Sequence, residues 1–338
     1  MKTKSMVIIG VDIIILINII GITFFYISSV NLLEEQIVDH LNSAAESRAN
    51  HIETFLDDKK ERAIDFSFDG FIITSLTSLE IGEGDPKHIK SNLSRYILLN
   101  KIPTDKDIYG IEVLNSQGII VSHSGEEETE EAHKEENKFF KTVFSLGKEG
   151  IFVSDIFYDK EFERNAYVVA APIYNRGEFL GVVIIKMGLE TLAEITTDRT
   201  GLGETGEIII VNKDRFLITP SRFLGGNAGI LTQEVDTKNS RDCFEDIEEY
   251  FNPELEEVEE HEDELLTYAD YRGEKVLGVH AYIPENDWCL LAQIDKSEVL
   301  KEPRQKLLGV SLFILLITSL FLILLVYFSG RFLDKNIY

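Results

Sequence analysis

TGLGETGEIIIVNKDRFLITPSRF, residues Thr200–Phe223, lies between two parts of the chain that repeat the same order of short strands. From Gly201 it contains the spacing GxGxxG, which matches a dinucleotide-binding fingerprint. That fingerprint needs a strand before the glycines and a helix after them, so that the helix N-terminus meets the pyrophosphate. Here Leu189–Thr197 is typical of a short helix and Glu207–Asn212 of a strand, which is the reverse order. We therefore interpret the glycines as turns in a connection between two modules.

Two apolar stretches lie near the ends of the chain, Met6–Tyr26 and Leu307–Phe328. Each is about 20 residues long, enough for a helix to cross roughly 30 Å of hydrocarbon. A cleaved signal peptide is the alternative for the first stretch, but its apolar run is longer than a usual signal core and no small-residue cleavage site follows. We expect two membrane-spanning helices in a lipid bilayer.

Charges beside the first apolar stretch predict the orientation of the chain. Lys2 and Lys4 precede it and Glu34 and Glu35 follow it, so the positive-inside rule places the N-terminus in the cytoplasm. A second span returns the C-terminus to the same side. The expected location is the cell membrane, with residues 31–306 extracytoplasmic and both termini cytoplasmic.

The extracytoplasmic segment is strongly acidic. The chain carries −26, and residues 1–30 and 307–338 contribute +1 each, so residues 31–306 carry −28. This charge repels nucleic acid and excludes it as a partner. The densest part, Asp242–Glu264, holds 13 acidic residues and no lysine or arginine. It lacks the spaced oxygen ligands and turning glycine of a calcium loop, so we expect a solvated face and no metal.

Both cysteines, Cys243 and Cys289, lie in the extracytoplasmic segment. An oxidising compartment would permit a disulfide between them, and two independent small core residues are the alternative. A zinc site would need histidines at ligand spacing, which are missing. The chain also has no nucleophile elbow, HExxH, P-loop or kinase motif set, so we expect no enzyme activity and no cofactor.

Between the two spans the residue pattern predicts an α+β fold. About Val30–Asp65 is amphipathic and long enough to form a stalk of some 50 Å, which favours pairing with a second copy as a homodimer. The expected strands of the first module are Ile108–Leu114, Ile119–His123, Ile151–Tyr158, Ala166–Tyr174 and Glu178–Lys186. Those of the second are Glu207–Asn212, Phe216–Thr219, Leu265–Tyr271, Lys275–Ile283 and Asp287–Ile294.

These patterns divide the chain into six segments: residues 1–30 with the first span, a stalk helix at 31–65, modules at 66–198 and 199–300, a linker and second span at 301–330, and a tail at 331–338. Each module is expected to contain an antiparallel sheet.

Three phrases carry a resemblance to a known family: AYVVAAPIYN from Ala166, GLGETGEIIIVNKDRFLITPSRF from Gly201, and YRGEKVLGVHAYIPENDWCLLAQID from Tyr271. With the order of helices and modules, they resemble the double Cache sensor domain of microbial chemoreceptors and sensor histidine kinases, over roughly residues 30–300. The resemblance implies two tandem PAS-like modules. It also implies a small ligand bound in the membrane-distal module, between the sheet and the loops that cover it.

Amino-acid-binding members of that family resemble one another in an Arg-x-Trp pair before the third strand, an aromatic and an Asp after it, and a second Asp at the end of the last strand. Here Gly125–Glu136 lacks the Arg-x-Trp pair, Phe157 and Asp159 match the middle positions, and Lys186 stands at the last. An ammonium in place of a carboxylate reverses the favoured charge, which suggests a ligand with a carboxylate or similar anion. The alternative is that Lys186 simply ends a strand in water.

Strand position adds four further candidates, each of which could equally be a packing residue: Tyr109, His123, Tyr158 and Tyr167.

The sequence thus predicts a membrane-anchored extracytoplasmic sensor of a small molecule that signals through its transmembrane helices. Only about ten residues follow Phe328, so we expect either a truncated or split receptor or a separate cytoplasmic signalling partner that the helices contact. The alternative function is a non-signalling extracytoplasmic binding or assembly protein that uses its acidic surface.

Overall fold

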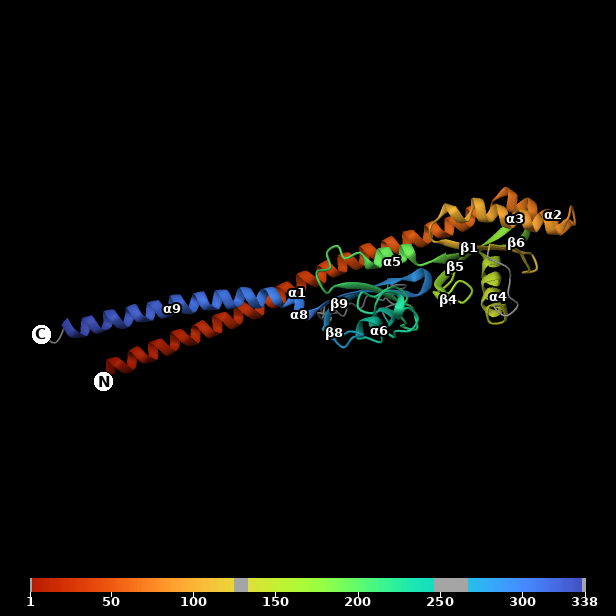
Figure 1. The fold of residues 1–338 in the computed structure, drawn as a ribbon. Helices are drawn as coiled ribbons and strands as arrows, with labels where there is room; N and C mark the ends of the chain where they lie inside the picture. Colours follow the sequence, from red (N-terminus) through yellow and green to blue (C-terminus); the bar gives the residue numbers. More distant parts are fainter. Residues whose placement is uncertain (1, 125–132, 246–266, 336–338) are drawn as a thin grey trace.

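The computed structural model describes residues 2–124, 133–245 and 267–335 and shows an elongated molecule built along its first helix (Figure 1). Helix α1, Lys2–Ser67, is 66 residues long and therefore about 100 Å. The predicted first span and stalk form this one helix, with no proline between them. We call residues 66–198 the distal module and 199–300 the proximal module, by their distance from the end that carries both termini.

The distal module follows α1 in sequence. Its elements are α2 (Gly70–Ile81), α3 (Pro86–Asn100), η1 (Ile102–Thr104), β1 (Ile108–Asn115), β2 (Ile120–His123), α4 (His133–Glu149), β3 (Phe152–Val153), β4 (Phe157–Asp159), β5 (Arg164–Asn175), β6 (Glu178–Gly188) and α5 (Glu190–Thr197). The strands pair antiparallel in the order β2-β1-β6-β5-β3, and β4 pairs with β5. The predicted β1–β2 hairpin is confirmed.

The predicted strand Ile151–Tyr158 is wrong as a single strand, because the chain leaves the sheet between β3 and β4. There Ser154 Oγ accepts the Val168 amide at 3.0 Å. Asp155 turns toward the proximal module and accepts from Trp288 Nε1 at 2.9 Å and from Asn212 Nδ2 at 3.1 Å. This turn therefore connects the two modules.

Alternate residues of the distal strands face opposite sides of the sheet. Ile111, Val113 and Ile185 face the core shared with α1, while Leu114 and Ile184 face α4. A side chain's parity along its strand therefore decides which of the two cores it joins.

The proximal module has a second antiparallel sheet in the order β7-β10-β9-β8. Its elements are β7 (Glu207–Val211), η2 (Asn227–Gly229), α6 (Lys238–Glu245), β8 (Thr267–Ala269), β9 (Lys275–Ile283), η3 (Pro284–Asn286), β10 (Trp288–Asp295) and α8 (Lys296–Val299). Cys243 of α6 and Cys289 of β10 form a disulfide, so the structure realises the first of the two alternatives for these residues. Most of the acidic stretch Asp242–Glu264 lies outside the described residues.

The predicted strand Phe216–Thr219 is not a strand of this sheet. Only an isolated bridge joins Val211 and Leu217. The Ile210 amide donates to the side chain of Thr219, Oγ1, at 2.9 Å instead of to a backbone carbonyl, so a hydroxyl interrupts the ladder.

The connection before β7 contains turns and lacks the strand–glycine–helix order of a dinucleotide-binding site. Gly203 has φ +70°, a left-handed conformation that favours glycine, and a Cβ at Gly206 would lie 1.9 Å from the Leu202 carbonyl oxygen. Helix α5 precedes the glycines and strand β7 follows them, which confirms the reversed order.

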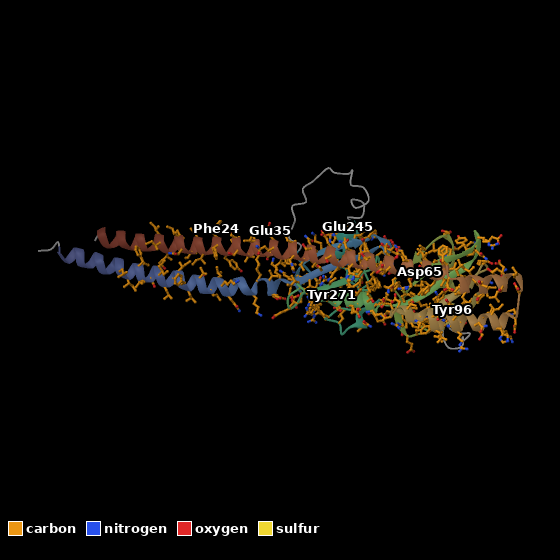
Figure 2. The ribbon with its side chains drawn as sticks, turned by 90° about the horizontal axis from the view of Figure 1, so that it is seen from above. Phe24, Glu35, Asp65, Tyr96, Glu245 and Tyr271 are labelled. Carbon is orange, nitrogen blue, oxygen red and sulfur yellow. A yellow bond between two sulfur atoms is a disulfide. The ribbon has the colours of Figure 1, made fainter. Side chains whose placement is uncertain are left out.

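Helix α9, Lys301–Lys335, leaves the proximal module and runs beside α1 toward the end that carries both termini (Figure 1). Both helices are long and apolar enough to cross a membrane. Their apolar side chains project outward, and Phe24 is 71% exposed (Figure 2). Exposed apolar surface of this extent is expected where lipid covers it. The observed α+β architecture, with two sheets and two flanking apolar helices, confirms the predicted fold class.

Candidate ligand-binding site

The candidate site lies on the face of the distal sheet that α4 covers. Alternate residues of a strand face the same side of the sheet. Lys186 therefore faces the same side as Val182 and Ile184 of β6, and Glu112 faces the same side as Leu114 of β1, which places both side chains on this face. Because β1 and β6 are neighbours, the two residues come close at one edge of the module. Strand pairing therefore positions the site's charged groups.

Lys186 is the centre of the site. Its Nζ lies 3.0 Å from Glu112 Oε1, 3.0 Å from Glu161 Oε2 and 3.7 Å from Asp159 Oδ2. The rings of Phe140 and Phe162 flank it, with centroids 5.1 and 5.3 Å from Nζ. The side chain is 1% exposed, so the interpretation that Lys186 ends a strand in water is wrong.

The pKa of Lys186 is raised. Burial lowers it, but the charges of Glu112 and Asp159 and the contact with Glu161 outweigh burial. The ammonium is therefore charged and already neutralised by protein carboxylates. This arrangement argues against the expected anionic ligand, which would have to displace a carboxylate from Lys186.

His123 joins two of these carboxylates. Its Nδ1 lies 3.4 Å from Glu112 Oε1, and its Nε2 lies 3.0 Å from Glu161 Oε1. The hydrogen bond with Glu112 raises the pKa of His123, against the effect of burial. The pKa of Glu112 is lowered, because His123 and Lys186 together outweigh burial, which raises it.

Asp159 is held by its own turn. Its Oδ1 accepts the amides of Glu161 and Phe162, at 2.9 and 3.2 Å, and its Oδ2 accepts the Tyr109 hydroxyl at 2.7 Å. Burial and then the charge of Asp159 raise the pKa of Tyr109 far above its usual range, so the phenol stays a donor. The guanidinium of Arg164 covers the Tyr109 ring at 4.6 Å.

We call Lys186, Glu112, Asp159, Glu161 and His123 the Lys186 cluster. Three carboxylates surround one ammonium, so its net charge is −2 with His123 neutral and −1 with His123 protonated. Glu112 Oε2 is buried and has no hydrogen-bond partner among the described residues. A buried carboxylate oxygen without a partner favours the binding of a hydrogen-bond donor, and the excess negative charge of the cluster favours a donor that carries a positive charge.

The other predicted residues divide between the two faces of the sheet. Phe157 lies on the site's face and packs on Phe139 with ring centroids 4.5 Å apart. Tyr167 faces α1 instead and packs on Phe55, so it lies across the sheet from the cluster. Tyr158 is 53% exposed and points away from the core. The structure thus brings together Tyr109, His123, Asp159 and Lys186, with Phe157 on the same face.

Sequence reasoning missed Glu112 and Glu161. Glu112 had a visible signal, because it is the one charged residue in the otherwise apolar strand IYGIEVLN. Glu161 had none, since it lies in the charged run DKEFER beside other exposed residues. The loop 125–132, where the Arg-x-Trp pair was sought, lies outside the described residues.

The family model described as Cache domain matches residues 29–302. The chain belongs to the Cache domain family. The resemblance to double Cache sensor domains is confirmed. A comparison with curated protein sequences gives no match.

Solved structures show the same Cache fold. The ligand-binding domain of Mlp24 with asparagine has a TM-score of 0.50 at 19% identity, covering 82% of this chain and 99% of that one. The ligand-binding domain of the Pseudomonas fluorescens chemoreceptor CtaA with L-isoleucine has a TM-score of 0.51 at 14% identity, covering 80% of this chain and 98% of that one. The sensor domain of the V. cholerae histidine kinase DctB has a TM-score of 0.51 at 14% identity, covering 78% of this chain and 98% of that one. At these identities the likeness concerns the fold alone.

Proposed function

We propose that this Cache protein is a membrane-anchored extracytoplasmic sensor that binds a small ligand with a protonated amine at the Lys186 cluster. The observation that carries the proposal is the buried Oε2 of Glu112, which has no hydrogen-bond partner among the described residues and lies within a cluster of net negative charge. An ammonium would give this oxygen a charge-assisted hydrogen bond and offset the excess charge. Mlp24 and CtaA, which share the fold, were solved with asparagine and L-isoleucine, both of which carry an amine.

Signalling would run through the two apolar helices. Helix α1 packs against both sheets, and β10 leads through α8 into α9, so both modules connect to the two apolar spans by continuous secondary structure. In this proposal residues 31–306 are extracytoplasmic, both termini are cytoplasmic, the stalk pairs in a homodimer, and a separate cytoplasmic protein receives the signal. A ligand that prefers one arrangement of the helices shifts the population toward it.

A ligand screen on the full chain in lipid nanodiscs tests this function. L-amino acids and linear diamines form one arm, and dicarboxylates form the opposite-charge arm. We expect an amine to raise the melting temperature, since a ligand at 100 times its Kd adds about 2.7 kcal/mol of stability. Glu112→Gln, which removes the negative charge at nearly constant shape, should abolish the shift.

Glu178→Gln is the matched control, because Glu178 is exposed at the start of β6 in the same sheet. It should leave the shift intact. A rise in melting temperature with a dicarboxylate that disappears in Lys186→Met would instead support an anionic ligand at this site. Absence of a shift in both arms would reject sensing at this site and favour a binding or assembly role for the acidic surface.

A further inference from the structure

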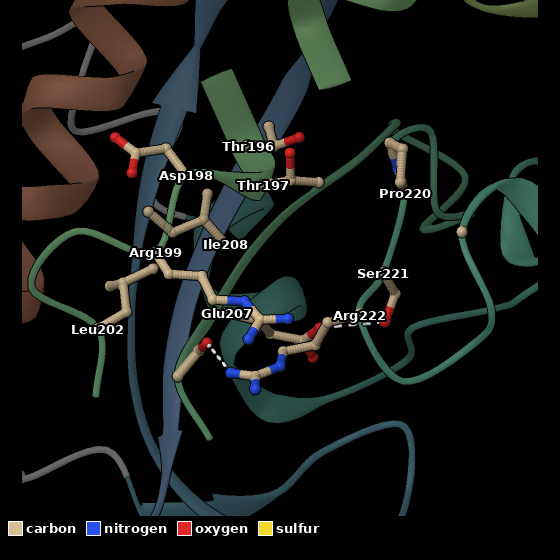
Figure 3. Close-up of a pocket in the computed structure, with 12 residues that line it drawn as sticks. Thr196, Thr197, Asp198, Arg199, Leu202, Glu207, Ile208, Pro220, Ser221 and Arg222 are labelled. Carbon is tan, nitrogen blue, oxygen red and sulfur yellow. Dashed lines mark hydrogen bonds between the residues drawn. The ribbon is translucent and has the colours of Figure 1, made fainter. Parts of the chain in front are cut away.

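A cavity of about 170 Å³ lies in the proximal module, away from the Lys186 cluster (Figure 3). The end of α5, the start of β7 and the segment 220–226 enclose it. Its volume is on the order of ten times the space that one water needs, and it is smaller than usual drug-sized pockets. The cavity therefore suits a ligand of a few heavy atoms.

Two guanidinium groups, those of Arg199 and Arg222, line this cavity and project toward its middle (Figure 3). Among the residues that the structure describes, the Arg199 side chain has no hydrogen-bond or ion-pair partner. Arg222 donates from Nη1 to the Gly206 carbonyl oxygen at 2.8 Å and pairs with no described carboxylate. Each guanidinium has five N–H donors, so most of their donors are unused by the described residues.

The two carboxyl groups in the lining are engaged by other partners. Asp198 pairs with Arg48 at 3.0 Å. Glu207 accepts from Tyr271 at 2.7 Å, from Gln293 at 2.9 Å and from Ser221 at 3.0 Å. Burial raises the pKa of Glu207 although these hydrogen bonds lower it.

Two arginines that pair with no described carboxylate are unusual in a segment of net charge −28, where carboxylates outnumber cations. Arginine's planar fork matches the two oxygens of a carboxylate or phosphate. We propose that this cavity binds a small soluble oxyanion, a carboxylate or phosphate, between Arg199 and Arg222. The site is separate from the distal site and opposite to it in charge preference.

A lipid headgroup is a poor source for this anion. Beside the cavity, the Gly201 carbonyl oxygen lies 2.7 Å from His40 Nε2 on α1. His40 follows the end of the first apolar stretch, Tyr26, by 14 residues, or about 20 Å along the helix. A dissolved anion reaches a site at this distance from the membrane freely, whereas a lipid headgroup would reach it only if the membrane bent toward the cavity.

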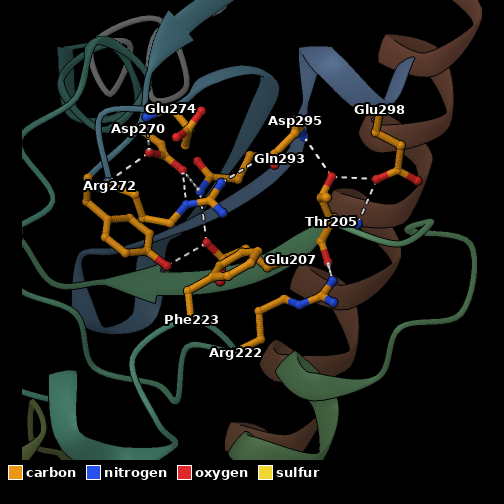
Figure 4. A network of polar contacts seen from close by, with 12 residues as sticks. Thr205, Glu207, Arg222, Phe223, Asp270, Arg272, Glu274, Gln293, Asp295 and Glu298 are labelled. Atoms are coloured by element: carbon orange, nitrogen blue, oxygen red, sulfur yellow. Dashed lines mark hydrogen bonds and ion pairs between the residues drawn. The ribbon is translucent and has the colours of Figure 1, made fainter. Parts of the chain in front are cut away.

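The anion would contact a connection that leads to the second apolar helix. Arg222 holds the Gly206 carbonyl, and the preceding amides of Glu204 and Thr205 donate to the Glu298 carboxylate, each at 2.7 Å (Figure 4). Glu298 belongs to α8, which is followed directly by α9. Gly206, which Arg222 contacts, is next in sequence to Thr205, so a ligand that binds Arg222 would lie close to the hydrogen bonds that hold α8.

Isothermal titration of the full chain in phosphatidylcholine nanodiscs, at constant ionic strength, tests the proposal with sodium phosphate, acetate and succinate. We expect at least one to bind, and Arg199→Gln to raise its Kd about tenfold or more, the loss of one charge-assisted pair. Arg199 has no side-chain partner to lose among the residues that the structure describes, so we expect this variant to keep the fold. Nanodiscs that contain phosphatidylglycerol should leave the Kd unchanged, and competition by this lipid would assign the cavity to a headgroup and overturn the soluble source.

Arg241→Gln is the matched control. Arg241 is exposed on α6 in the same module, so its loss should change the Kd by no more than about a factor of two. Glu112→Gln, in the distal site, should also leave anion binding intact. The proposal is overturned if none of the three anions releases or absorbs heat, if Arg199→Gln binds like the native chain, or if Glu112→Gln abolishes binding.

Discussion

Lys186 is buried at 1% exposure, and its charge is balanced by carboxylate side chains. Three carboxylates lie within 3.7 Å of its Nζ, and two aromatic rings close the site above them. In such a site the attraction between charges offsets the cost of removing them from water only while every partner is present. The cluster is therefore sensitive to the loss of one member.

Lys186→Met should destabilise the full chain by about 3–5 kcal/mol, because it leaves buried carboxylates facing one another without a cation. Urea unfolding in detergent measures this change. Lys141→Met is the control, since Lys141 is exposed on α4, the helix that covers the site. An equal, small effect for both variants would show that the Lys186 ion pairs add no stability.

The sequence could predict the place of the site better than its chemistry. The family pattern pointed to Asp159 and Lys186, and strand position pointed to Tyr109 and His123; strands β6, β4, β1 and β2 bring these four residues together. The expected preference for an anion considered Lys186 without its neighbours. Those neighbours include Glu161, whose approach depends on the turn that Asp159 forms after β4 and on no residue pattern.

At the scale of elements, the long strands were predictable, while the ranges Ile151–Tyr158 and Phe216–Thr219 were not. The ranges expected for β5 and β6 lie inside the observed strands, because their apolar runs form the centre of the distal sheet. Phe216–Thr219 has a comparable apolar pattern, but the hydroxyl of Thr219 replaces a ladder bond. A side chain that accepts a hydrogen bond in place of a backbone carbonyl does not change the hydrophobic periodicity, so the pattern cannot predict it.

The disulfide between α6 and β10 closes a loop across 46 positions of the proximal module. Its reduction should cost about 2–5 kcal/mol, mainly by freeing the unfolded chain. Hydrogen exchange of β10 amides, with and without a reductant, measures the loss. The chain has only these two cysteines, so the variant with both replaced by alanine should exchange faster and show no response to reductant. Equal protection in all samples would contradict a stabilising bond.

At the scale of the whole molecule, α1 links the two modules from one side, and the Asp155 turn links them from the other. The turn contributes two hydrogen bonds from the proximal module to Asp155, and Asn286 Nδ2 adds a third to the Ser154 carbonyl at 3.1 Å. The Lys186 cluster lies close in sequence to this turn, because Asp155 precedes β4 and Asp159 is its last residue. The turn therefore connects the candidate site to the proximal sheet through the hydrogen bonds of Asp155 with Trp288 and Asn212.

Asp155→Ala should loosen this contact and expose Trp288, whose indole is fully buried and donates to Asp155. Trp288 is the only tryptophan of the chain, so its emission reports this interface directly, and we expect a shift to longer wavelength. Asp214→Ala removes the same charge from an exposed turn of the proximal module and should leave the emission unchanged. Identical spectra for both variants would mean that α1 alone holds the modules together, and a ligand at the distal site would then have to act on α9 through α1.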